Sequence, residues 1–204
     1  MLARDALLIA VLLSPACPVT CPASAQPSRA EARQVCAVHR AVSHRKPLRP
    51  ETCATIAQAL NETPDPLRLH AMGVNESGSR PDALRVTVRS DGLVAYDVGL
   101  LQVRCLVDPA RKDTVCLNGP AKGLTVKRLL NPATNIRTAW AVYEMHGRDP
   151  GRFNGATGNR AKRYRQRIAA IEAALMGLPF VAPDKRTREL CKRIVDAMGK
   201  EPRS

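Results

Sequence analysis

The chain has 204 residues, enough for one domain of ordinary size with a hydrophobic core. Its 32 basic and 18 acidic side chains give a formal net charge of +14, which favours polyanionic partners. Only two Phe, three Tyr and one Trp occur, so few rings could stack on bases, and this counts against a nucleic-acid binder.

The first 25 residues have the composition of a secretory signal peptide. Arg4 precedes an apolar run of eight residues, and the segment ends in Ala23-Ser24-Ala25, a small-residue A-x-A cleavage motif. The run is too short to anchor the chain across a bilayer. We therefore expect an exported mature chain without a transmembrane segment.

Export would place the remaining cysteines in an oxidising compartment, where they pair if geometry allows. Cleavage after residue 25 leaves Cys36, Cys53, Cys105, Cys116 and Cys191. We favour the local pairs Cys36–Cys53 and Cys105–Cys116, each closing a short loop worth ~3 kcal/mol in the chain-entropy treatment. Cys191 is then left over, unless the pairing differs. No CxxC or His-rich spacing indicates a metal site.

The first half of the mature chain is predicted to be helical after a basic lead-in. Residues 26–50 read as a polar lead-in and linker, with a proline-broken connector at its end. Apolar residues at helical spacing start at Thr52, and the sequence "NETPDP" ends that helix. A second helix is predicted from about Pro66 to Glu76-Ser77-Gly78.

The second half is predicted to contain one hairpin and three further helical segments. Residues 85–97 alternate around Asp91-Gly92, a strong hairpin signal, and 105–116 read as a loop tied by its two cysteines. Asn131-Pro132 supplies a capping side chain and a first-turn proline for a helix. A turn-rich loop is predicted at 146–159, followed by a helix that carries Tyr164, Ile168, Ile171 and Leu175 on one face. A C-terminal extension at 179–204 contains a basic amphipathic segment, 186–198. The fold class is therefore mainly α with a small β-hairpin.

Glu76 is the side chain with the most unusual predicted position. A lone Glu at a helix end is usually solvated and inert. Near a helix C-terminus, however, the macrodipole disfavours ionisation of a carboxyl, and a covering hairpin would raise its pKa further by desolvation. Both effects keep the acid protonated near neutral pH, as a general acid requires.

Four motifs follow one another around this residue: "NES" at 75–77, "GLLQV" at 99–103, "NPATNIRTAWAVYEMH" at 131–146 and "FNGATGNRAKRY" at 153–164. In this order they resemble the lysozyme-like lytic transglycosylases, the SLT family, over about residues 50–175. The hairpin between "ES" and "YDVGLLQV" is most similar to the specialised transglycosylases of secretion and conjugation machines. The resemblance implies a lysozyme-like domain at 51–178.

The resemblance also implies roles for individual residues. Glu76 matches the family's single catalytic acid, and Ser77 matches the serine that helps to orient the sugar. Gly99 and Gln102 match the residues of the "GLMQ" motif that line the groove. Asn135 matches the asparagine of the "NI" motif, Asn154 matches the asparagine of the "YN" motif, and Tyr164 matches the tyrosine on the following helix. Phe153 stands where the family has the "YN" tyrosine, so a hydroxyl is missing there, and Tyr164 or Tyr96 would supply one. Leu101 replaces a methionine. Ala133 stands where secretion-type members often carry a cysteine that pairs with the equivalent of Cys53, so a Cys36–Cys53 bond would be a local replacement.

The implied reaction cleaves the bond between N-acetylmuramic acid and N-acetylglucosamine in peptidoglycan. Glu76 protonates the glycosidic oxygen and then deprotonates the 6-hydroxyl of the same muramic residue, which closes a 1,6-anhydro ring without consuming water. The family requires no metal or organic cofactor. The implied partners are glycan strands and components of an envelope-spanning machine, and the implied location is the bacterial periplasm, at the wall.

Three alternatives remain open at this stage. A hydrolysing muramidase of the same fold would use Asp97, or a held water, as its second group, because ordinary glycosidases work with two carboxyls. A wall-binding assembly protein that has lost turnover is suggested by Phe153. A nucleic-acid binder ranks last.

Other conspicuous residues are given structural roles. Trp140 is expected in the core rather than as a sugar platform, His70 as structural, and His146 as a helix cap. The basic cluster at 159–167 is expected to be a solvated helix face. The alternative is that it contacts the anionic peptide stems and lactyl groups of the wall. Residues 148–204 carry 14 basic and 6 acidic side chains, and deleting 183–204 is expected to weaken wall binding at low salt while sparing cleavage of soluble fragments.

Overall fold

The computed structural model describes residues 27–43, 45–111 and 114–199, so the predicted signal peptide and the last five residues lie outside it. Its elements are α1 Arg29–Val42, α2 Pro50–Asn61, α3 Pro66–Ser77, β1 Leu84–Val88, β2 Val94–Val98, β3 Val103–Val107, the 3-10 turn η1 Gly119–Ala121, α4 Val126–Leu129, α5 Pro132–Met145, α6 Pro150–Phe153, α7 Gly158–Leu175 and α8 Lys185–Gly199. The described chain is mainly helical with one small antiparallel sheet, as predicted.

The predicted helix starts are formed by local capping. The Asn131 side chain accepts a hydrogen bond from the Thr134 N–H, and Pro132 occupies the first turn of α5. Asp65 caps α3 in the same way, ahead of Pro66. These residue types satisfy backbone N–H groups that have no partner inside the helix.

The hairpin is confirmed, but the sheet has one strand more than the sequence predicted. Strands β1 and β2 pair antiparallel around the turn at Asp91-Gly92, and β3 pairs with β2 along the other edge. The loop predicted at 105–116 is wrong at its start, because residues 105–107 belong to β3. The side chains of this strand alternate: Val103, Cys105 and Val107 are buried while Arg104 is exposed.

Both predicted disulfides are present, and Cys191 is free and buried. Cys36–Cys53 joins α1 to α2, which places part of the predicted lead-in against the helical core. Helix α1 packs on α2 and on α8, and a capping box of Ser28 and Glu31 begins it. Two disulfides are typical of proteins that fold in an oxidising compartment.

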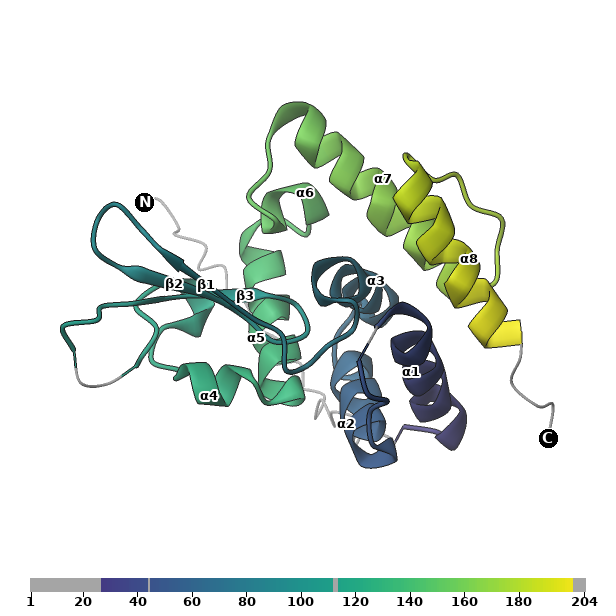
Figure 1. Cartoon of the computed structure of the whole chain (residues 1–204), viewed down its shortest axis with the longest axis horizontal. Coiled ribbons are helices and arrows are strands. Elements are labelled where there is room, and N and C mark those ends of the chain that lie inside the picture. Colours follow the sequence, from purple (N-terminus) through teal and green to yellow (C-terminus); the bar gives the residue numbers. More distant parts are fainter. Residues whose placement is uncertain (1–26, 44, 112–113, 200–204) are drawn as a thin grey trace, which may run out of the picture.

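Helix α3 occupies the middle of the molecule. In Figure 1 the sheet and α4 lie on one side of it and α1, α7 and α8 on the other, with α5 and α6 beside it. Leu69, Ala71 and Met72 of α3 are fully buried. The sheet, α6 and α7 therefore lie around the C-terminal end of α3, where Glu76 is located.

Helix α8 is docked on the domain rather than projecting from it. It packs on α7 and α1, and its Thr187, Cys191 and Ile194 are buried. None of the helices that the structure describes is long and apolar enough to cross a membrane.

Candidate active site

The Glu76 carboxyl lies at the end of α3, where Gly78 takes a left-handed conformation and ends the helix. The side chain is half-buried, and its Oε1 accepts hydrogen bonds from the Tyr164 hydroxyl and from Asn154 Nδ2, the latter at 3.1 Å. Tyr164 is on α7 and Asn154 follows α6. Three segments far apart in the sequence thus converge on one carboxyl, and all three were predicted to belong to the site.

Opposing effects act on the pKa of Glu76, and burial prevails. Desolvation raises the pKa above its ordinary value, and the negative charge of Asp97 raises it further. The hydrogen bonds from Tyr164 and Asn154 stabilise the ionised form and lower the pKa in part. The result is a carboxyl that binds its proton more tightly than a solvated Glu but retains donors that support the anion.

Tyr164 supplies the hydroxyl that Phe153 lacks. Burial and the nearby Glu76 charge raise the pKa of Tyr164 well above its ordinary value, so the phenol stays protonated and donates to Oε1. Phe153 lies in α6 with its ring edge-on to Tyr143, at 6.4 Å between centroids. Tyr96 was the other candidate, but its strand neighbour Asp97 faces the cavity beside Glu76, so Tyr96 points to the opposite face of the sheet.

A cavity of about 620 Å³ opens between the sheet and helices α5 and α6 on one side of Glu76. Among the residues that line it are Glu76, Asp97, Gln102, Arg104, Phe153 and Asn154. We call it the sheet-side cavity. Its walls combine apolar surface with hydrogen-bonding and charged side chains of both signs, as small-molecule sites commonly do.

Asp97 is the second carboxyl in the sheet-side cavity, and Arg104 holds it. The two residues are direct partners across β2 and β3, with Arg104 Nε 2.8 Å from Oδ1 and Arg104 Nη2 3.2 Å from Oδ2. Sequence analysis missed this pairing because it depends on β3. Both carboxylate oxygens of Asp97 are thereby engaged.

Two of the predicted site residues, Asn135 and Gly99, lie beneath the sheet-side cavity rather than in it. Asn135 is fully buried; its Nδ2 donates to the Val98 carbonyl at 2.8 Å and its Oδ1 accepts from the Leu101 N–H at 2.9 Å. Gly99 has φ +73°, and a Cβ there would come within 2.5 Å of Asn135 Nδ2. The side chain of Asn135 therefore fixes the turn that carries "GLLQ".

Ser77 fixes the same turn from the other side. Its hydroxyl donates to the Leu100 carbonyl at 2.7 Å and accepts from the Arg80 N–H at 2.9 Å. Ser77 is mostly buried; its hydroxyl ties the helix that carries Glu76 to the "GLLQ" turn, and the residue also lines a cavity on the side of Glu76 away from the sheet. Gln102, at the end of the turn, does line the cavity, with φ +48° and its Nε2 donating to the Gly99 carbonyl at 2.9 Å.

The remaining predicted residues take mixed positions. Trp140 is only partly buried, and the Arg148 guanidinium lies 5.1 Å from its ring centroid. His70 is buried, which lowers its pKa to about 4, and its Nε2 has no partner among the described residues. His146 is at the C-cap of α5, as predicted, and also lines the sheet-side cavity.

The chain matches no protein-family model, no curated protein and no solved structure. Within the residues that the structure describes, no three His, Cys, Asp or Glu side chains gather closely enough to hold a metal ion.

Proposed function

We propose that the protein is a peptidoglycan lytic transglycosylase that cleaves the bond between N-acetylmuramic acid and N-acetylglucosamine and forms 1,6-anhydro-muramic ends. The observation that carries the proposal is the half-buried Glu76 carboxyl with a raised pKa, held by Tyr164 and Asn154 at the wall of a groove. A single acid of this kind can donate a proton and later accept one, as the reaction needs.

The geometry suggests which oxygen carries the proton. Oε1 of Glu76 accepts both hydrogen bonds, so Oε2 holds the transferable proton. That proton passes to the leaving glycosidic oxygen as the bond to C1 breaks. The carboxylate, stabilised by Tyr164 and Asn154, then takes the proton of the 6-hydroxyl as that oxygen bonds to C1. Glu76 returns to its protonated form, and no water is consumed.

The biological role that fits this reaction is local opening of the cell wall, by an exported protein, for a secretion or conjugation apparatus. It is supported by the sequence motifs around the hairpin and by the two disulfides, which suit a periplasmic enzyme.

Asp97 favours a second candidate, a hydrolysing muramidase. It lines the same cavity as Glu76, and its charge raises the pKa of Glu76. Its ion pair with Arg104 engages both of its oxygens, which leaves the carboxylate poorly placed to activate water or to attack C1. Transglycosylation is therefore preferred. The remaining alternative, a wall-binding protein without turnover, is favoured only by Phe153.

Digestion of purified sacculi by the mature protein distinguishes the three. We expect products with anhydro-muramic ends, one water lighter by mass spectrometry than hydrolysed ends. Glu76→Gln should remove this activity by at least about a hundredfold, while Glu51→Gln, an exposed acid on α2, should not change it. Hydrolysed ends would contradict the proposal and favour the hydrolysing muramidase. Sacculi that remain intact would contradict it and favour the wall-binding protein without turnover.

A further inference from the structure

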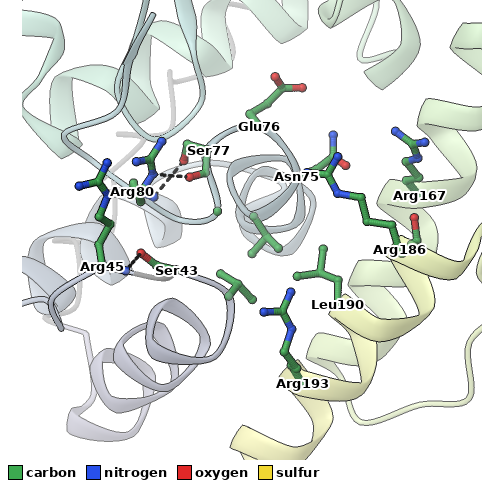
Figure 2. A pocket seen from close by; sticks show the side chains of 14 residues that line it. Ser43, Arg45, Asn75, Glu76, Ser77, Arg80, Arg167, Arg186, Leu190 and Arg193 are labelled. Atoms are coloured by element: carbon green, nitrogen blue, oxygen red, sulfur yellow. Dashed lines mark hydrogen bonds between the residues drawn. The ribbon is translucent and has the colours of Figure 1, made fainter.

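A second cavity, of about 570 Å³, lies on the other side of Glu76 and is dominated by arginine. It is formed by the C-terminal ends of α1 and α3 together with α7 and α8, and Figure 2 shows its guanidinium groups arranged around it. Five arginines from separate parts of the chain line it: Arg45, Arg80, Arg167, Arg186 and Arg193. We call it the arginine pocket.

Most of these charges lack a carboxylate within the described parts of the chain. Arg167 is paired with Asp184, at 3.0 Å, and Arg80 Nε donates to the Ser77 carbonyl at 2.9 Å. Arg45, Arg186 and Arg193 form no ion pair with any described acid. Glu76, at the rim, is the one acidic side chain among the residues that line the pocket. Like charges held together at this density favour an anionic occupant.

The floor of the arginine pocket is apolar. Val42 and Val74 are buried there, and Leu190 of α8 lies beside them. No aromatic ring lines the pocket, whereas Phe153 lines the sheet-side cavity. An apolar floor with guanidinium walls suits a ligand with an aliphatic body and several carboxylates, because arginine binds carboxylates through paired hydrogen bonds. A neutral sugar ring has no such groups.

We propose that the arginine pocket binds the carboxylates of the peptide attached to the glycan strand, next to the bond that Glu76 protonates. The inference rests on the proposed function, because it assumes that a strand lies along Glu76. The two cavities have Glu76 in common, so a strand in the sheet-side cavity would bring its neighbouring muramic residue, with the peptide on its lactyl group, to the arginines. Peptide-bearing glycan would then be preferred over glycan without peptides.

Binding by the Glu76→Gln variant tests the proposal without requiring turnover. Soluble glycan strands that retain their peptides, and the same strands after an amidase has removed the peptides and left one lactyl carboxylate on each muramic residue, are titrated into the immobilised protein. We expect at least about tenfold tighter binding to the peptide-bearing glycan, since two or more charge-assisted hydrogen bonds are lost with the peptide. Adding Arg186→Gln and Arg193→Gln should abolish this preference.

A matched control is available on the same helix. Arg188 and Lys192 of α8 are exposed and do not line the pocket, so replacing both with Gln removes the same charge from the other face. This control should keep the tenfold preference. Thermal melting of both double variants checks that α8 remains docked.

Each outcome is decisive. Equal binding to the two glycans, or equal loss in the two double variants, overturns the proposal and assigns the effect to overall charge. A preference that depends on Arg186 and Arg193 supports it, even if the active protein releases no anhydro ends. Anhydro ends without the preference would leave the proposed function standing while the pocket assignment fails.

Discussion

The hydrogen bond from Tyr164 to Glu76 is the contact that most directly tunes the proposed acid. It stabilises the carboxylate and so lowers the pKa of Glu76, against the larger raising effect of burial. A general acid works only while protonated, so cleavage should decline as pH rises through this pKa.

Tyr164→Phe should therefore move that decline to higher pH, because the carboxylate loses a donor. The maximal rate should fall by roughly ten- to a hundredfold, since the anion formed after proton donation is less well supported. The pH profile of kcat on glycan fragments measures both effects. Tyr96→Phe is the control: Tyr96 lies on the opposite face of the sheet from Asp97, so loss of its hydroxyl should leave the profile in place. An unshifted profile in Tyr164→Phe would contradict the assignment.

The raised pKa of Glu76 also predicts how the free energy of unfolding depends on pH. Its folded pKa lies above the unfolded value, so between the two pKa values the folded chain binds more protons, and the free energy of unfolding falls as pH rises through that window. Gln does not titrate. Glu76→Gln should thus be stabilising relative to the wild type at pH 7, and nearly neutral at low pH where the acid is protonated. Urea denaturation at the two pH values measures this, and an equal effect at both would show that the carboxyl is solvated.

At the scale of elements, the "GLLQ" turn is held in place by one buried amide. Asn135→Ala leaves the Leu101 N–H and the Val98 carbonyl without their partner, and each buried unsatisfied group costs about 1–3 kcal/mol. We expect a loss of about 2–4 kcal/mol in the free energy of unfolding, measured by denaturant titration. Thr134→Ala, one residue earlier on α5, makes neither bond and should cost far less.

Helix α8 is expected to behave as part of the core. Ile194 is fully buried while its neighbour Val195 is 37 % exposed. Ile194→Ala should lower the free energy of unfolding by about 2–5 kcal/mol, and Val195→Ala should stay within about 0.5 kcal/mol. If both melt like the wild type, α8 is not docked in solution. Deleting 183–204, the change that the sequence suggested for testing wall binding, would uncover this surface, so substitutions of surface arginines are the cleaner test.

Sequence reasoning found the elements whose signals are local. Asn131-Pro132 marks a helix start, Asp91-Gly92 marks a hairpin turn, and both disulfides close short loops. It missed β3, because two cysteines in a short span indicated a loop and the alternation around Cys105 covers only five residues. It also missed α6, a single turn of helix inside a segment rich in Gly.

The sequence predicted which residues belong to the candidate site but not which of them are buried. The Glu76, Asn154 and Tyr164 cluster comes together as expected. Gly99 and Asn135 were expected to face the groove, yet they lie beneath the turn, and Ser77, expected to orient the sugar, ties the turn to α3; burial of this kind has no local sequence signal. The arginine pocket could not be found either, because its members are separated by as much as 148 positions and converge only when α8 docks.

For the molecule as a whole, the net charge of +14 should make wall binding depend on ionic strength. The Debye length shrinks from ~30 Å at 0.01 M to ~8 Å at 0.15 M, so exposed charges distant from the wall are screened first. Sedimentation of the Glu76→Gln variant with sacculi should decline steadily over this range. Binding that is insensitive to salt would show that charge contributes little and that uncharged groove contacts dominate.

The buried position of Cys191 has a consequence for how the chain matures. An unpaired thiol among four partnered cysteines can attack a neighbouring bridge and scramble the pattern, and the attacking species is the thiolate. Once α8 has docked, burial raises the pKa of Cys191 to about 11 and removes its sulfur from contact with oxidants. Docking of α8 thus closes off the unpaired sulfur of the described chain, which could otherwise attack either disulfide, and the two bridges are protected once the helix has packed.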